Sequence, residues 1–268
     1  MFKALAFSLC MQQRSRSFLL VLLTLGVGLS SCKKDPADEP DPVTPQAPTG
    51  VVKLTVVPEW EGAPMQRFTE YRNFMDYRVN VELLKLYLGE VRLANGGVEK
   101  ALSDVLYFDL GDGPVSQTWR LDTGTWTGMK AGLGVPSLLN YADPAGYGPG
   151  HPLNVSNGTY WTWATGYRFM MFEGRYDPDP LSTDPLINSY SLHPGMDTCY
   201  AAVELWPSGG IQVRQGDTAF VTVRLAVDEF FHSANGTIDL VTENTAHGGN
   251  LPLALKFTDN VVRSISVD

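Results

Sequence analysis

Short β-rich runs separated by turn residues are the feature that most constrains the fold of this chain. Residues 219–227 (AFVTVRLAV) show it best, because Val221 and Val223 alternate with polar neighbours, the period of two that is typical of a half-buried strand. Similar runs occupy residues 51–57, 77–93, 105–110, 129–135, 160–172 and 200–205. No window shows a long helical period. The pattern therefore predicts an all-β fold, a single-domain β-sandwich of short antiparallel strands with long loops.

The first 31 residues have the order of a signal peptide. Three basic residues precede an apolar run at 18–29, and small residues follow it in the tetrapeptide LSSC, which ends at Cys32. The run of 12 apolar residues is shorter than the ~20 that a membrane-spanning helix needs, so it predicts a targeting segment. LSSC also resembles the lipobox of bacterial lipoproteins. We therefore expect residues 1–31 to be removed and Cys32 to carry lipid.

Residues 32–50 predict a lipidated, proline- and aspartate-rich tether. Positions 33–50 contain five prolines and four acidic residues, too little apolar content to offset the entropy of ordering. Lipidation that adds two or more acyl chains gives stable membrane attachment. The acids that follow Cys32 resemble a surface-export signal of Bacteroidetes lipoproteins. These features predict an outer-membrane lipoprotein whose body, residues 51–268, faces the periplasm or the cell surface.

Charge and motifs exclude several functions. Loss of residues 1–31 removes Lys3, Arg14 and Arg16 and no acid, so the net charge of −9 becomes −12, which disfavours nucleic acid as a partner. The chain has no GxSxG, P-loop, dinucleotide-binding or HExxH motif, and each of these serves a known chemistry. We therefore expect a protein without catalytic activity of its own.

Three soft metal ligands lie close together in residues 192–199 (LHPGMDTC). His193, Met196 and Cys199 carry the imidazole, thioether and thiol groups that suit copper, and Cu(I) in particular. The alternative is structural, because Met and free Cys are common core residues. Cys199 would be the last free cysteine once Cys10 is removed and Cys32 is lipidated, so no intramolecular disulfide is expected.

Trp161 and Trp163 form the second candidate. In a strand their side chains would share one face. Two tryptophans on one face are usually part of a core, whereas on an exposed concave face they often stack on sugars. The sequence leaves both interpretations open.

Residues 160–169 (YWTWATGYRF) resemble the W-x-W-x-x-G-Y-[KR]-F signature of MbnP-like proteins, a family of exported copper-binding proteins with many lipoprotein relatives in Bacteroidetes. Further segments resemble the family in the same order, at residues 81–93, 128–143, 193–199, 228–240 and 256–267. The resemblance spans about residues 51–268, which are therefore expected to form an MbnP-like β domain.

The resemblance implies one copper site with histidine ligands, and His193 occupies the position of a ligand. It also implies a partner, a dihaem peroxidase related to MauG that oxidises a tryptophan of the copper protein to kynurenine. Trp161 or Trp163 would be the oxidised residue.

Two family histidines are replaced in this chain. Tyr141 stands in the segment LNYAD, where relatives have LNHAD, and Glu59 follows the first strand, where relatives often have histidine. Both could donate oxygen to the metal, which would harden the site. These expectations favour a membrane-anchored copper-binding protein for copper acquisition or handling. The alternative is a surface β-sandwich that binds glycan or protein and has a degenerate metal site.

Overall fold

The computed structural model describes residues 47–162, 164–247 and 249–268. Residues Gln46–Asp268 form one compact unit. The predicted signal peptide, Cys32 and most of the tether lie outside the described residues. Within the described part of the chain, no helix is both long and apolar enough to cross a membrane.

One sheet is built around the long strand β1 (Thr49–Trp60). Alternate residues of β1 are buried, as its period-two sequence predicts. Strand β7 (Val115–Asp122) pairs with β1 antiparallel, and β16 (Thr218–Ala226) pairs with it in parallel. The short strands β2 (Ala63–Pro64) and β20 (Ile265–Val267) complete the sheet. The parallel pair departs from the expected antiparallel pairing, because β1 and β16 come from opposite ends of the domain.

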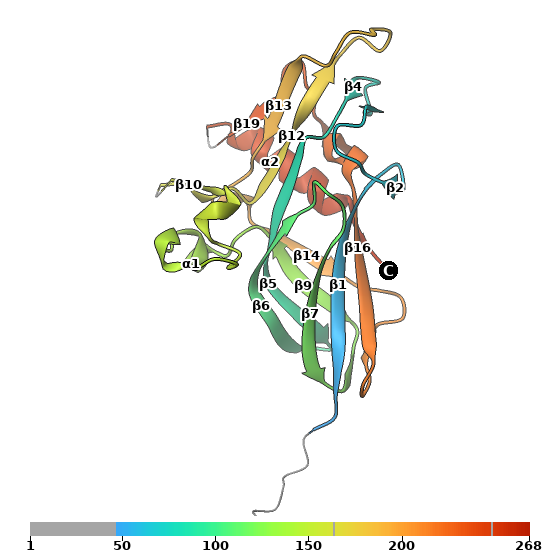
Figure 1. Cartoon of the computed structure of the whole chain (residues 1–268), viewed down its shortest axis with the longest axis vertical. Coiled ribbons are helices and arrows are strands. Elements are labelled where there is room, and N and C mark those ends of the chain that lie inside the picture. The colour runs from blue at the N-terminus through green and yellow to red at the C-terminus, as the bar shows by residue number, and fades with distance from the viewer. Residues whose placement is uncertain (1–46, 163, 248) are drawn as a thin grey trace, which may run out of the picture. The chain divides into compact units, whose positions relative to one another are not determined.

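The second sheet has the strand order β14-β9-β5-β12-β13-β19, and β6 pairs with the other edge of β5 (Figure 1). Strands β3 and β4 pair with each other, and β4 also pairs with β12. Together the two sheets enclose one continuous apolar core, so the prediction of an all-β sandwich is confirmed. The strands of this sheet are β3 (Tyr71–Arg72), β4 (Arg78–Val79), β5 (Leu83–Asn95), β6 (Val98–Asp109), β9 (Gly128–Leu133), β12 (Met170–Asp177), β13 (Asn188–Leu192), β14 (Ala201–Leu205) and β19 (Thr245–Ala246).

Three small two-stranded pairs lie at the margins of these sheets. They are β8 (Gly124–Trp126) with β15 (Ile211–Val213), β10 (Tyr160–Thr162) with β11 (Gly166–Tyr167), and β17 (His232–Ser233) with β18 (Gly236–Thr237). The pair β10–β11 contains the tryptophan signature, and its position determines where Trp161 lies.

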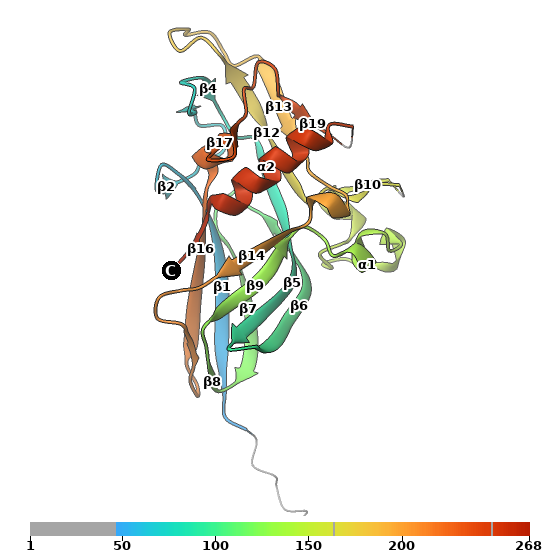
Figure 2. The same ribbon diagram turned by 180° about the vertical axis from the view of Figure 1, so that it is seen from behind.

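Helix α2 (Leu251–Arg263) is the main element that the sequence pattern did not predict. The Asn250 side chain caps it by accepting a hydrogen bond from the Leu253 amide, and a proline stands in its first turn, where the missing N–H is harmless. Its buried face includes Phe257, whose ring stacks on Phe172 of β12 with centroids 5.8 Å apart. Figure 2 shows α2 lying across strands β12 and β13.

The helix packs through an aromatic cluster. Phe172, Tyr190, Phe257 and two phenylalanines of the 3₁₀ helix η4 (Val227–Phe231) lie in mutual ring contact, with centroids 5.2 to 6.0 Å apart. Aromatic pairs in such geometries add stability beyond their buried area. The cluster therefore holds one face of strands β12 and β13 against the core. The side chains on the opposite face of these two strands line a candidate site.

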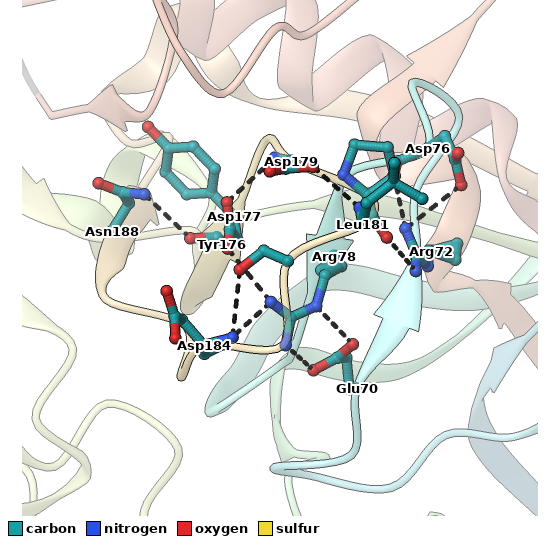
Figure 3. Close-up of polar contacts among 12 residues, drawn as sticks. Glu70, Arg72, Asp76, Arg78, Tyr176, Asp177, Asp179, Leu181, Asp184 and Asn188 are labelled. Atoms are coloured by element: carbon teal, nitrogen blue, oxygen red, sulfur yellow. Dashed lines mark hydrogen bonds and ion pairs between the residues drawn. The ribbon is translucent and has the colours of Figure 1, made fainter.

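The loop between β12 and β13 is held by a buried arginine. Arg78 on β4 donates from Nε and Nη2 to the two oxygens of Glu70, each at 2.8 Å, and from Nη1 to Asp177 and to the Asp184 carbonyl (Figure 3). Its side chain is only 7% exposed. A planar guanidinium can satisfy all of these acceptors at once, so Arg78 ties the acidic loop to β4 and to Glu70.

Candidate metal site

The site lies where three neighbouring strands present one face. Tyr190 and Leu192 of β13 point into the core, so Ser191 and His193 lie on the opposite face. Ser191 is paired with Glu173 of β12 across the antiparallel ladder. On its other side β13 pairs in parallel with β19, as Ser191↔Thr245 and Leu192↔Ala246.

The same register brings two histidines together. The next residues after the paired positions are His193 and His247, and the His193 amide donates to the Ala246 carbonyl at 2.8 Å. Their rings are stacked with centroids 4.8 Å apart and an interplanar angle of 20°. The Ser191 hydroxyl lies 3.1 Å from Nε2 of His193 and 2.9 Å from Nε2 of His247. Because one oxygen contacts both nitrogens, the two Nε2 atoms face the same point.

Glu173 contributes a carboxylate to this point. Its Oε1 lies 2.8 Å from Nε2 of His193, and His193 is only 6% exposed. Burial, together with the neighbouring His247 and Arg168, lowers the pKa of His193 to about 3. The ring is therefore neutral at pH 7, and its contact with Glu173 is a hydrogen bond rather than an ion pair.

This hydrogen bond assigns one proton of the metal-free site. A carboxylate can only accept, so Nε2 of His193 carries the proton that it donates to Glu173. The Ser191 hydroxyl is hydrogen-bonded to Nε2 of His247, as donor or acceptor according to the tautomer of that ring. Burial also lowers the pKa of His247, so both rings are neutral and can offer a lone pair to a metal once the proton of His193 moves to Nδ1.

Trp161 and Arg168 form the wall of the site on the side of the β10–β11 pair. The Trp161 ring meets His247 edge-on, with centroids 5.6 Å apart and an interplanar angle of 85°. The guanidinium carbon of Arg168 lies 5.0 Å from the centre of the Trp161 ring, a cation–π contact. Arg168 also forms a bridge with Gly195, two residues after His193, so the signature hairpin is joined to the histidine loop.

A buried asparagine positions that hairpin. Asn140 ends helix α1 (Ser137–Asn140), and its Oδ1 accepts from the Tyr167 amide at 2.8 Å while its Nδ2 donates to Asp197 at 3.1 Å. The preceding residue, Gly166, has φ +67°, and a Cβ at that position would collide with Oδ1 of Asn140. The glycine of the signature is therefore required both by its backbone conformation and by this close approach.

The other predicted ligands lie elsewhere. Tyr141 is 46% exposed at the end of α1. Glu59 lies on β1 in the first sheet, where its carboxylate is paired with Arg224. Their ligation of a metal stays a prediction, and the ion pair of Glu59 argues against its part in it.

The two soft candidates lie in the segment that follows His193. Cys199 is buried at the end of the 3₁₀ helix η3 (Asp197–Cys199), and burial raises the pKa of its thiol. Met196 precedes that helix, and its carbonyl accepts a hydrogen bond from the Cys199 amide. Both are explained by packing and local backbone structure. Trp163 is not among the described residues, so Trp161 is the tryptophan whose position near the pair is known.

His247, Glu173 and Ser191 were not identified from the sequence. No local motif marks them, because they meet His193 only through the pairing of β12, β13 and β19. The remaining two histidines are separate from the pair: His151 stacks on Tyr147 and His232 stacks on Phe74.

The described residues contain no group of three or more His, Cys, Asp or Glu side chains that could hold a metal ion. What they do contain is two neutral imidazoles facing one point, with a carboxylate beside one of them. Imidazole nitrogens suit copper, zinc and nickel. The 2.8 Å between His193 and Glu173 is a hydrogen-bond distance, and it places the carboxylate beside the ring nitrogen.

Comparison with known proteins places the chain in a family. The MbnP family model matches residues 49–249. Among solved structures, MbnP from Methylosinus trichosporium is similar, with 14% sequence identity, a TM-score of 0.47, and coverage of 75% of this chain and 81% of that one. No curated protein gives a significant match. The family model covers well over half of the chain, and the protein is therefore a member of the MbnP family.

Proposed function

We propose that this protein binds copper through His193 and His247 and serves copper acquisition or handling without catalysing a reaction itself. The observation that supports the proposal is the convergence of both Nε2 atoms on the Ser191 hydroxyl. Neutral imidazoles do not have to lose the proton of a charged form before they bind a metal. This chain lacks histidine at two positions where its relatives have it. His247 supplies a second histidine beside His193.

The surroundings of the pair suit a site that is shielded from water. His193 is buried, and Trp161 covers the edge of His247. Glu173 can act as a third, oxygen ligand, or it can accept a hydrogen bond from a ligand ring, as carboxylates beside metal-bound histidines do. The glycan-binding alternative has less support, because the Trp161 ring is already in contact with Arg168 and His247.

We further propose that the protein acts from a membrane. The lipobox at Cys32 and the proline-rich tether support attachment to the outer membrane by lipid, with the copper site on the periplasmic or outer side. A MauG-like dihaem peroxidase is the proposed partner, and Trp161 is the proposed target of its oxidation.

The test is a metal titration of the chain without residues 1–31, carrying Cys32→Ser to prevent lipidation. We expect the wild-type protein to bind one copper ion, and His193→Ala and His247→Ala each to lower the affinity by at least tenfold. His232→Ala is the matched control, because His232 is also half-buried and stacked on a ring but lies outside the site. Unchanged stoichiometry and affinity in both site variants would show that the proposal is wrong.

A further inference from the structure

Arg168 places a fixed positive charge beside the histidine pair. Its Nη1 donates to the Gly158 carbonyl at 3.1 Å, and its guanidinium lies against the Trp161 ring. Its Nε is buried and has no hydrogen-bond partner among the described residues. None of the ion pairs found in the described part of the chain includes Arg168. The charge of this residue is therefore not cancelled by a carboxylate in direct contact.

The position of Arg168 is well defined by its neighbours. Its backbone forms the bridge to Gly195 and donates to the Thr159 carbonyl at 2.9 Å. The side chain is held between the Gly158 carbonyl and the Trp161 ring, and that ring touches His247. The charge also acts on both imidazoles, since it opposes protonation of His193 and of His247.

The effect of such a charge depends on the charge of the ion that binds. Coulomb repulsion between Arg168 and a bound ion is proportional to the charge of the ion, so a divalent ion is repelled about twice as strongly as a monovalent one. Partial burial strengthens this difference because it lowers the local dielectric response. Glu173 attracts both kinds of ion, but its charge is the same in the wild type and in variants of residue 168. A difference between them therefore reports the charge of residue 168.

We propose that Arg168 shifts the preference of the His193–His247 site toward a soft monovalent cation, such as Cu(I), and away from divalent cations. The inference rests on the proposed metal-binding function. It adds which ionic charge the site prefers in the metal that it binds. Arg168 acts here through space as a selectivity residue and is not itself a metal ligand, since a guanidinium has no free lone pair at neutral pH.

Ag(I) and Zn(II) test the idea without copper redox chemistry, because neither changes oxidation state. Affinities for both ions would be measured on the chain without residues 1–31, carrying Cys32→Ser, and on its Arg168→Gln, Arg168→Met and Arg168→Lys variants. We expect the two neutral variants to raise the Zn(II) affinity relative to the Ag(I) affinity by about tenfold, and Arg168→Lys to keep the wild-type ratio. A tenfold shift in the ratio of Cu(II) to Cu(I) affinity would lower the copper reduction potential by about 59 mV.

Arg120→Gln is the control for net charge, because Arg120 is an exposed residue of β7 in the other sheet. Thermal unfolding of each variant shows which of them are folded, and the use of both Gln and Met at position 168 provides two independent neutral variants. The inference is wrong if the ratio of Zn(II) to Ag(I) affinity stays constant in the folded neutral variants, or if it shifts equally in Arg120→Gln. Either result leaves the proposed metal-binding function standing. If the wild-type protein binds neither ion, the proposed metal-binding function fails and this inference fails with it.

Discussion

His193 and His247 follow the ends of two parallel strands in the same register, and their rings stack with centroids 4.8 Å apart. The Ser191 hydroxyl lies between their Nε2 atoms. A buried imidazole and a half-buried one this close disfavour protonation of either ring, because a charged ring would be poorly solvated and would repel a second charge. The pair is therefore kept in the neutral form, which is the form that a metal requires.

The first prediction concerns stability as a function of pH. His193 has a pKa of about 3 in the folded protein and about 6.5 in an unfolded chain. Between these values the unfolded chain binds the additional proton, so the stabilising contribution is complete above pH ~6.5 and is lost as the pH falls. Between these pKa values His193 contributes up to about 1.4 kcal/mol per pH unit to the slope of the free energy of unfolding against pH. We expect His193→Gln to remove this contribution. Denaturant unfolding of the metal-free protein at several pH values would show it, and parallel curves for wild type and variant would contradict it.

The second prediction concerns the oxidised tryptophan. Trp161 lies against His247 and Arg168, so it is the residue whose modification would change the metal site. After co-expression with a MauG-like dihaem peroxidase, peptide mass mapping should locate kynurenine at position 161, and Trp161→Phe should abolish the mass change. Trp206→Phe is the control, since Trp206 is an exposed residue that directly follows β14. Kynurenine that persists in Trp161→Phe would point to another tryptophan.

The third prediction concerns the glycine of the signature. Gly166→Ala would force a left-handed backbone conformation on alanine and push a methyl group into Asn140. We expect a loss of stability on the order of 2 kcal/mol, together with loosening of the hairpin that carries Trp161. Gly148→Ala is the control, because nothing lies within 4 Å of a Cβ there. Thermal unfolding compares the two, and equal melting temperatures would refute the role assigned to Gly166.

The fourth prediction concerns Arg78. Replacement by Met leaves the carboxylates of Glu70 and Asp177 and the Asp184 carbonyl without their common donor. Because one guanidinium serves all of these acceptors, we expect a clear loss of stability. Arg263→Met removes an exposed helical ion pair with Asp259 and should change the stability by less than about 1 kcal/mol. Similar losses in both variants would argue against a special role for Arg78.

The fifth prediction concerns Cys32. Metabolic labelling with a tagged fatty acid should mark the wild-type protein and place it in the membrane fraction. Cys32→Ser should lose the label and appear in the soluble fraction, because no lipid would then retain it. Cys199→Ser is the control cysteine, since it is buried in the domain. Label retained in Cys32→Ser would contradict the lipoprotein interpretation.

Local sequence patterns were sufficient to predict several features of this protein. Alternation in β1 and β16 predicted strands with one buried face, and the segment that contains Trp161, Gly166 and Arg168 identified the family. The same segment contains two members of the site, Trp161 and Arg168. His193 was proposed first from the soft-ligand segment 192–199 and then from the family resemblance. Helix α2 was missed because its short amphipathic run lies between loops that have no strong pattern.

What the sequence by itself determined is thus the content of each element and the face that each strand buries, since both follow from side-chain period and turn chemistry. Only the tertiary structure decided which strands are neighbours. The parallel pairing of β13 with β19 brings His247 to His193, and the antiparallel pairing with β12 brings Glu173. A period of two tells which face a side chain occupies but not which strand lies beside it. Here that choice depends on long-range packing, chiefly of α2 and η4 against Phe172 and Tyr190.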